Sequence, residues 1–157
     1  MSQPYDFYVQ RSIGVAAEER LDKHFGNWFD ITPATDAEQR KGIDRHYHLR
    51  LDGRRFTVEY KCDRLAHKTG NVFIETVSVD RAHRSGWGYT CTADWLLYYV
   101  PYSELIYMLR MRDVTKSLPG WERQYTHKAV QNASYQTHGV LVPLVEFEKL
   151  AFQVVSL

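Results

Sequence analysis

The order of apolar and polar positions at the start of the chain predicts a helix followed by strands. Between residues 15 and 28, Ala17, Leu21 and Phe25 recur at helical spacing and share one face, which predicts an amphipathic helix that ends near Gly26. Glu18 lies beside this apolar face on the helical wheel. It is either an ordinary boundary acid of a surface helix or an acid aimed at the edge of a site.

Three strand-like segments follow this helix. Residues 43–51 alternate apolar and polar positions, whereas residues 55–62 and 71–79 are more continuously apolar. Asp52-Gly53 separates the first two segments and is typical of a two-residue hairpin turn, so we expect antiparallel neighbours there and a meander through the third segment. Together with the helix, these segments predict an α/β fold with a central mixed β-sheet flanked by helices.

The second half of the chain is rich in aromatic residues and predicts shorter elements. The pattern indicates, in order, a hairpin at 95–109, a short helix at 111–118 ended by Pro119-Gly120, a long polar loop at 121–138 and a final strand at 139–147. We expect residues 86–157 to complete the sheet and to offer a surface for a dimer partner or for DNA, since aromatic side chains bury large areas.

Composition sets the outer limits of these expectations. A chain of 157 residues that is 44% hydrophobic predicts one folded domain over 1–157. The apolar run 95–100 is too short to cross a membrane, and the first residues, Met-Ser-Gln-Pro-Tyr-Asp, do not resemble a signal peptide. Two cysteines match no zinc pattern. We therefore expect a cytoplasmic protein.

Two acids and a lysine around the predicted hairpin carry the most informative chemistry. Asp44 stands at the start of the first strand, and Glu59 and Lys61 share one face of the second because residues two apart on a strand point the same way. With Asp52-Gly53 as the hinge, we expect Asp44 near Lys61 and within reach of Glu59. Carboxylates suit Mg²⁺, and a nearby ammonium suits a phosphate. The alternative is an exposed ladder of salt bridges, which contributes only ~0–1 kcal/mol per pair.

Gly42-Ile43-Asp44 followed by Val58-Glu59-Tyr60-Lys61 resembles the core signature of the PD-(D/E)xK nuclease superfamily. That group includes restriction endonucleases, Holliday-junction resolvases, phage exonucleases and compact homing endonucleases. The resemblance runs from residue 15 to residue 79 and implies a restriction-endonuclease-like fold with a catalytic core of about residues 12–80. It also favours a protein of a bacterium or its phage. Two features depart from it: Ile43 stands where a proline often precedes the first acid, and no helix is evident directly after the second strand.

The resemblance implies roles for four residues of this chain. Asp44 and Glu59 would bind Mg²⁺, for which Mn²⁺ could substitute, Lys61 would orient a water molecule, and Glu18 stands where many members carry a further acid. Two other side chains are candidates for supporting positions. Gln39 lies just before Gly42 and is otherwise an ordinary polar loop residue, while Glu75 lies in the third strand and is otherwise a strand acid with a local partner.

Positive charge is concentrated between residues 40 and 84, although the formal net charge of the chain is only +1. This local concentration predicts a phosphate-facing surface, whereas any one cluster alone would be ordinary solvated surface. The candidate contacts are Arg40, Lys41, Arg45, Arg64, His67, Lys68 and Arg84. His46 and His48 share a strand face, but no third ligand accompanies them, so we expect contact with nucleic acid or simple exposure.

The sequence therefore predicts a Mg²⁺-dependent DNA endonuclease that acts as a homodimer on duplex or branched DNA, one site for each strand. Three alternatives stay open at this point: an exonuclease, a Holliday-junction resolvase on the same fold, and a non-catalytic module that binds nucleic acid. The sequence does not distinguish DNA from RNA.

Overall fold

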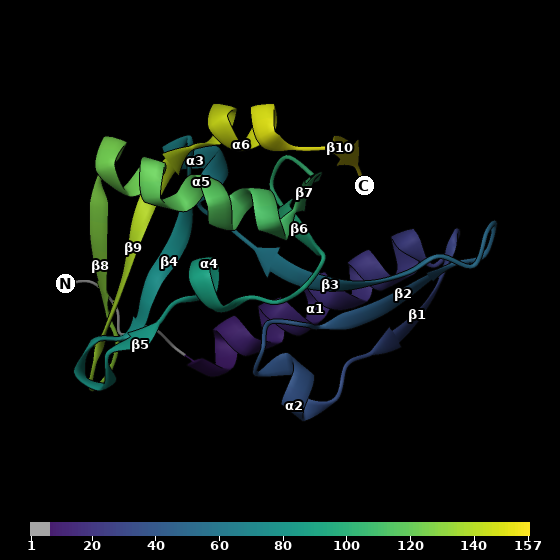
Figure 1. Cartoon of the computed structure of the whole chain (residues 1–157), viewed down its shortest axis with the longest axis horizontal. Helices are drawn as coiled ribbons and strands as arrows, with labels where there is room; N and C mark the ends of the chain where they lie inside the picture. The colour runs from purple at the N-terminus through teal and green to yellow at the C-terminus, as the bar shows by residue number, and fades with distance from the viewer. Residues whose placement is uncertain (1–6) are drawn as a thin grey trace.

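The computed structural model describes residues 7–157 and contains two β-sheets flanked by helices (Figure 1). The helices are α1 (Phe7–Phe25), α2 (Asp36–Gln39), α3 (Ala66–Thr69), α4 (Trp87–Thr90), α5 (Met111–Gln124) and α6 (Leu144–Leu150), with a 3-10 turn, η1, at Asp80–Ala82. The strands are β1 (Phe29–Pro33), β2 (Arg45–Leu49), β3 (Arg55–Cys62), β4 (Asn71–Val79), β5 (Arg84–Ser85), β6 (Trp95–Val100), β7 (Leu105–Arg110), β8 (His127–Gln131), β9 (Gln136–Pro143) and β10 (Gln153–Ser156). The expectation that no signal peptide is present concerns residues 1–6, which lie outside the described residues.

The larger sheet has six strands in the order β1-β2-β3-β6-β7-β10. Every neighbouring pair is antiparallel except β3 and β6, which run parallel, so the sheet is mixed as the sequence predicted. A parallel pair needs a long crossover connection. Here the crossover consists of α3, β4, β5 and α4, and it carries the chain into the second sheet before it returns to β6.

The expected meander of three strands is wrong at its third member. β4 does not pair with β3 but leaves the six-stranded sheet and forms a four-stranded sheet of order β5-β4-β9-β8. The burial patterns explain the exchange. Positions 96–100 of β6 are all buried, as a central strand requires, whereas β4 alternates buried and half-buried residues along most of its length.

The predicted long loop at 121–138 is also wrong. α5 continues through Pro119 to Gln124, and β8 and part of β9 occupy most of the remainder. Met111, Val114, Leu118 and Trp121 form a buried stripe along α5. The burial of this stripe offsets the ~3 kcal/mol that an interior proline costs a helix, so Pro119 does not end it.

The predicted helical face of α1 is confirmed. Ala17, Leu21 and Phe25 are buried against one face of the six-stranded sheet, where Val58 and Tyr60 of β3 meet them. The opposite face of that sheet packs against α5, α6 and the strands of the second sheet. In Figure 1, α1 crosses the six-stranded sheet on one side while α5 and α6 lie over the other part of the molecule. The middle of β3 is thus covered on both sides, and Val58, Glu59 and Tyr60 are buried there.

The β2–β3 hairpin has a different register from the predicted one. Arg45 lies opposite Val58, and the backbone N–H of Leu49 donates to the carbonyl oxygen of Arg54 at 2.8 Å, so residues 50–53 all belong to the loop. A two-residue turn at Asp52-Gly53 would have placed Asp44 opposite Lys61. The longer loop shifts the pairing by two residues and places Asp44 beside Glu59 instead.

Among the helices described between residues 7 and 157, none has the length and apolar character that a membrane crossing requires.

Gly42 lies just before this hairpin, where the backbone turns with a positive φ and passes close to Cys91. Replacing it tests this close approach. Its φ is +77°, and an added Cβ would lie 2.9 Å from the Cα and Sγ of Cys91. We expect Gly42→Ala to lower the free energy of unfolding by about 2 kcal/mol or more, because strain in φ and a backbone contact combine. Urea denaturation measures the change.

Gly70→Ala is the matched control for this prediction. Gly70 also has a positive φ, +68°, but an added Cβ there meets nothing within 4 Å. We expect a loss of only about 1 kcal/mol, from backbone strain alone. Equal losses in the two variants would contradict the tight approach of Gly42 to Cys91.

Candidate functional site

The structure brings Asp44, Glu59 and Lys61 together at the open end of the β2–β3 hairpin, away from its loop. The backbone N–H of Asp44 donates to the carbonyl oxygen of Val58 at 2.8 Å, which continues the ladder one residue beyond the start of β2. The Asp44 carboxylate then accepts a hydrogen bond from the backbone N–H of Tyr60 at 2.8 Å. Lys61 Nζ lies 2.5 Å from Glu59 Oε1. The two acids and the ammonium therefore share one site, as the residue pattern predicted.

Burial gives this site unusual electrostatics. The Glu59 side chain is only 6% exposed, and burial raises its pKa to about 7; Lys61 opposes this shift and the neighbouring Asp44 carboxylate adds to it. For Lys61, burial favours the neutral amine, but the charges of Glu59 and Asp44 outweigh it and raise the pKa of the ammonium. The site thus holds two close carboxylates and a lysine that stays charged at neutral pH.

The second sheet supplies the other wall of the site. Burial raises the pKa of Glu75 on β4, while the charge of Lys61 and a hydrogen bond from the backbone N–H of Trp87 favour its ionised form. Lys61 Nζ also lies 5.4 Å from the centroid of the Trp87 ring. Glu75 on the four-stranded sheet therefore lies near Lys61 on the six-stranded sheet, although their strands, β4 and β3, do not pair.

Two glycines let α4 approach β4 closely enough to form this wall. An added Cβ at Gly86 would lie 2.4 Å from the carbonyl oxygen of Glu75, and one at Gly88 would lie 2.9 Å from it. The sequence analysis did not single out Trp87 as a site residue. The closely spaced glycines on both sides of an aromatic residue were the available indication of close backbone packing.

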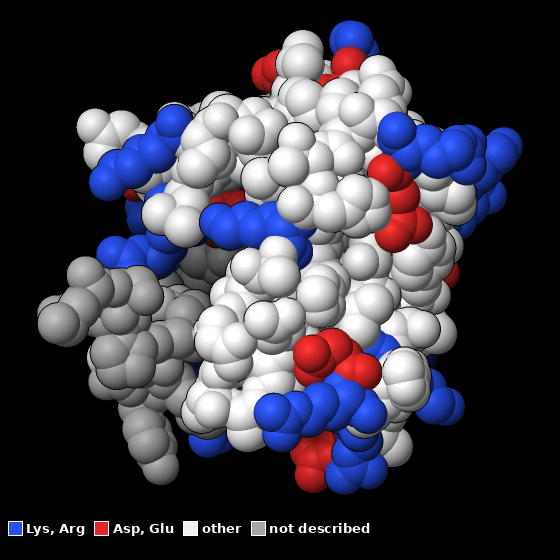
Figure 2. Space-filling model, turned by 90° about the vertical axis from the view of Figure 1, so that its left-hand side faces the viewer, with Lys and Arg blue, Asp and Glu red and all other residues white. Residues whose placement is uncertain are grey.

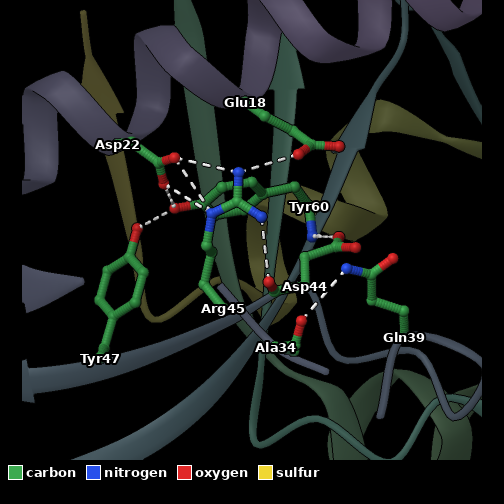
Figure 3. Close-up of polar contacts among 8 residues, drawn as sticks. All are labelled: Glu18, Asp22, Ala34, Gln39, Asp44, Arg45, Tyr47 and Tyr60. Atoms are coloured by element: carbon green, nitrogen blue, oxygen red, sulfur yellow. Dashed lines mark hydrogen bonds and ion pairs between the residues drawn. The ribbon is translucent and has the colours of Figure 1, made fainter. Parts of the chain in front are cut away.

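Glu18 lies at the edge of the site, but it is bonded to a residue that sequence reasoning assigned to DNA (Figure 3). Its Oε2 accepts a hydrogen bond from Arg45 Nη2 at 2.9 Å. Burial, and next the charge of Asp44, raise the pKa of the Glu18 carboxylate, which shows that it is close to the other acids. Arg45 also donates to Asp22, another acid that the sequence analysis missed. Asp22 follows Glu18 by four residues on α1, so the two project from one helix face.

Gln39 lies beside Asp44 in Figure 3, but its amide does not reach Lys61 through any hydrogen bond of the described residues. Its Nε2 donates instead to the carbonyl oxygen of Ala34 at 3.2 Å. Gln39 therefore ties α2 to the end of β1, next to the loop that carries Asp44.

The predicted phosphate contacts fall into three groups. Arg40 and Lys41 are exposed just before Asp44, Arg64 and Lys68 are exposed after β3, and Arg84 is exposed on β5. Arg45 differs from them, since its side chain is only 13% exposed and its guanidinium is bonded to carboxylates. We therefore do not count it among the phosphate contacts.

His67 is packed rather than open. Its ring stacks on that of Tyr102, with centroids 4.1 Å apart and an interplanar angle of 12°. Within residues 7–157, its buried Nδ1 finds no hydrogen-bond partner.

Figure 2 shows the side of the molecule formed by the four-stranded sheet, where Lys and Arg form separate groups with uncharged surface between them. The basic residues thus do not merge into one continuous patch on that face.

The donor set at this site suits a hard divalent cation whose remaining ligands are water molecules or substrate oxygens. Within residues 7–157, no three His, Cys, Asp or Glu side chains form a group that could hold a metal ion by themselves. His46, for example, pairs with Glu38, with Nε2 and Oε1 3.1 Å apart. Mg²⁺, however, usually keeps several waters and takes one or two carboxylates together with substrate phosphates. Asp44 and Glu59 fit that mode of binding.

Comparisons with known proteins give a distant structural likeness and no match in sequence. The sequence matches no protein-family model and no curated protein. Among solved structures, the chain is similar to a bacterial homing endonuclease, I-Ssp6803I, with 18% sequence identity and a TM-score of 0.47. The match covers 71% of this chain and 74% of that chain. A likeness this distant carries no argument about activity, and the chemistry of the site follows from its own geometry.

The raised pKa of Glu59 predicts how stability depends on pH in the metal-free protein. Folded Glu59 holds its proton up to about pH 7, whereas the unfolded carboxyl loses it near the ordinary value of 4.5. The contribution of Glu59 to stability is therefore fully present below the unfolded value and is lost as pH rises through about 7. We expect the wild type to lose about 1–2 kcal/mol more than Glu59→Gln between about pH 5.5 and about pH 8, measured by urea denaturation in EDTA.

Other acids with raised pKa, including Glu18 and Glu75, are present in both proteins and do not affect this difference. The exposed acid Glu19 provides a control, since Glu19→Gln keeps Glu59 and should show the wild-type fall. An equal fall in wild type and Glu59→Gln would show that Glu59 is not desolvated in the folded protein.

Proposed function

We propose that this protein is a Mg²⁺-dependent DNA endonuclease of the PD-(D/E)xK type. One observation carries the proposal: two carboxylates and a lysine ammonium from adjoining segments, Asp44, Glu59 and Lys61, meet at one site in which Glu59 is buried and the other two side chains are half-buried. A metal-dependent nuclease needs such a set, because it must bind a cation and a phosphate at the same point. An ordinary ladder of surface salt bridges would have left Glu59 in water.

Asp44 and Glu59 would hold the divalent cation, with Glu18 at its edge, and Mn²⁺ would substitute for Mg²⁺. When bound, such an ion supplies positive charge to a phosphate oxygen and lowers the pKa of a water molecule. The two carboxylates repel each other in its absence, which is part of the reason that the pKa of Glu59 is raised. A cation between them would remove that repulsion.

Lys61 would position the attacking water and stabilise the negative charge that develops on the phosphate. Its pKa is raised, so at neutral pH it is an ammonium and a donor rather than a base. Glu59 on one side and the Trp87 ring on another restrict where this ammonium can point. Such preorganised charge is more effective than charge that must be desolvated during the reaction.

Cleavage of both strands of a duplex would use two copies of the chain, one site for each strand. A candidate contact surface lies beside the C-terminal half of α1, where the six-stranded sheet is left partly uncovered. Trp28 and Phe152 are 53% and 67% exposed there, and they border an apolar hollow of about 440 Å³ whose lining includes Phe56 and Trp95. Aromatic side chains of this kind are enriched at protein interfaces.

Plasmid nicking tests the proposed reaction. We expect the wild type to nick supercoiled DNA with Mg²⁺ or Mn²⁺ and to be inactive in EDTA. Lys61→Ala and Asp44→Asn should each lower the cleavage rate by about 100-fold or more, because each removes a group that interacts with the reacting phosphate or its cation.

Lys149→Ala is the matched control, since Lys149 forms a lysine–glutamate pair with Glu146 at 2.8 Å on the exposed surface of α6. It should cleave at the wild-type rate. Binding of DNA without cleavage in every divalent metal would point to the non-catalytic module instead. Cleavage of linear but not circular DNA would point to an exonuclease, and a preference for four-way junctions to a resolvase.

A further inference from the structure

Arg45 is the centre of a network of hydrogen bonds that joins α1, β2 and β3 (Figure 3). Its Nε donates to both carboxylate oxygens of Asp22, at 3.1 and 3.0 Å, and its Nη2 donates to Glu18 Oε2 at 2.9 Å. Its Nη1 donates to the backbone carbonyl oxygen of Asp44 at 3.0 Å. These acceptors occupy the guanidinium on three sides, which leaves little of it for a phosphate.

Tyr60 closes the network on the β3 side. Its hydroxyl donates to Asp22 Oδ1 at 2.8 Å, and its backbone N–H donates to Asp44 Oδ2 at 2.8 Å. The Arg45 guanidinium carbon also lies 5.5 Å from the centroid of the Tyr60 ring. Asp44 is thus held at two points, at its carbonyl oxygen by Arg45 and at its carboxylate by Tyr60.

The geometry of the network requires an arginine. A guanidinium offers five donors in a planar fork, and here it serves Asp22, Glu18 and the Asp44 backbone at once. A lysine ammonium would keep the charge but could not reach these acceptors with the same geometry. Arg45 also links the helix that carries Glu18 to the strand that follows Asp44, so it fixes two of the proposed cation ligands relative to each other.

We propose that Arg45, held by Asp22 and Tyr60, is a positioning residue that sets the carboxylates of Glu18 and Asp44 for a divalent cation. The inference rests on the proposed function and adds to it the residues that orient the ligands. It also reassigns Arg45, whose place among the basic residues 40–84 had suggested a phosphate contact. Groups that orient metal ligands typically contribute about 10–100-fold to metal affinity.

Calorimetric titration with Ca²⁺ in the absence of DNA tests the inference without relying on cleavage. We expect Arg45→Lys and Tyr60→Phe to bind Ca²⁺ about 10–100-fold and about 3–10-fold more weakly than the wild type. The Mg²⁺ concentration for half-maximal cleavage should rise in parallel. The Kd for duplex DNA in EDTA, measured by fluorescence anisotropy, should stay within about 3-fold of the wild type, since neither residue contacts phosphate in this account.

Arg50→Lys is the matched control. Arg50 lies in the β2–β3 loop and its Nε donates to Asp30 at 2.7 Å, but this exposed pair touches no proposed ligand. It should leave Ca²⁺ affinity unchanged. Thermal unfolding of each variant shows whether the fold is retained, and Tyr60→Phe, which removes one hydroxyl and keeps the ring, provides the test if Arg45→Lys does not fold.

Weaker DNA binding in EDTA with unchanged Ca²⁺ affinity in Arg45→Lys would identify Arg45 as a phosphate contact and overturn the inference. Unchanged Ca²⁺ affinity in a folded Tyr60→Phe would overturn it as well. A wild type that binds Ca²⁺ but cleaves no DNA would contradict the proposed nuclease, while the Ca²⁺ affinities of the variants would still decide the role of Arg45. A wild type that binds no Ca²⁺ would overturn both.

Discussion

The alignment of β2 with β3 is the constraint on which the candidate site depends. A slip of one residue would turn Tyr47 and Val58 out of the core under α1, so the face of each strand is fixed by burial. A slip of two residues would keep the faces but move Asp44 away from Glu59. That second possibility is prevented by the four-residue loop at 50–53 and by the hydrogen bond from Asp44 to Val58. The same register brings the backbone N–H of Tyr60 to the Asp44 carboxylate.

The site combines charge with burial, and this combination connects the fold to the proposed chemistry. β3 lies between α1 and the second sheet, so the Glu59 side chain is removed from water. It also stands beside a second carboxylate, that of Asp44. Lys61 offsets part of the repulsion, and the tight packing of α4 on β4 brings Glu75 and Trp87 to the same lysine. An arrangement of this kind opposes the stability of the metal-free protein at neutral pH, and in the proposed function a divalent cation would relieve the repulsion between the carboxylates.

The sequence predicted the residues of this site better than it predicted the path of the chain around it. Glu59 and Lys61 share a face because residues two apart on a strand point the same way, and this follows from the strand pattern alone. The position of Asp44 just before the hairpin is equally local in the sequence. The exact register did not follow, because Asp52-Gly53 is typical of a two-residue turn while the loop is longer. The second sheet was missed because β4 and β6 are both apolar strands, and their patterns do not determine which of the two pairs with β3. Arg45 was assigned to DNA because its partners, Glu18 and Asp22, come from a helix that is distant in the sequence.

A crystal structure with duplex DNA and Ca²⁺, a cation that usually occupies such sites without supporting cleavage, tests the central claim most directly. We expect one Ca²⁺ at about 2.3–2.6 Å from carboxylate oxygens of both Asp44 and Glu59 and from an oxygen of a DNA phosphate, with Lys61 Nζ directed at the same phosphate. DNA bound on another face of the protein, or the carboxylates of Asp44 and Glu59 without a cation between them in that complex, would contradict it.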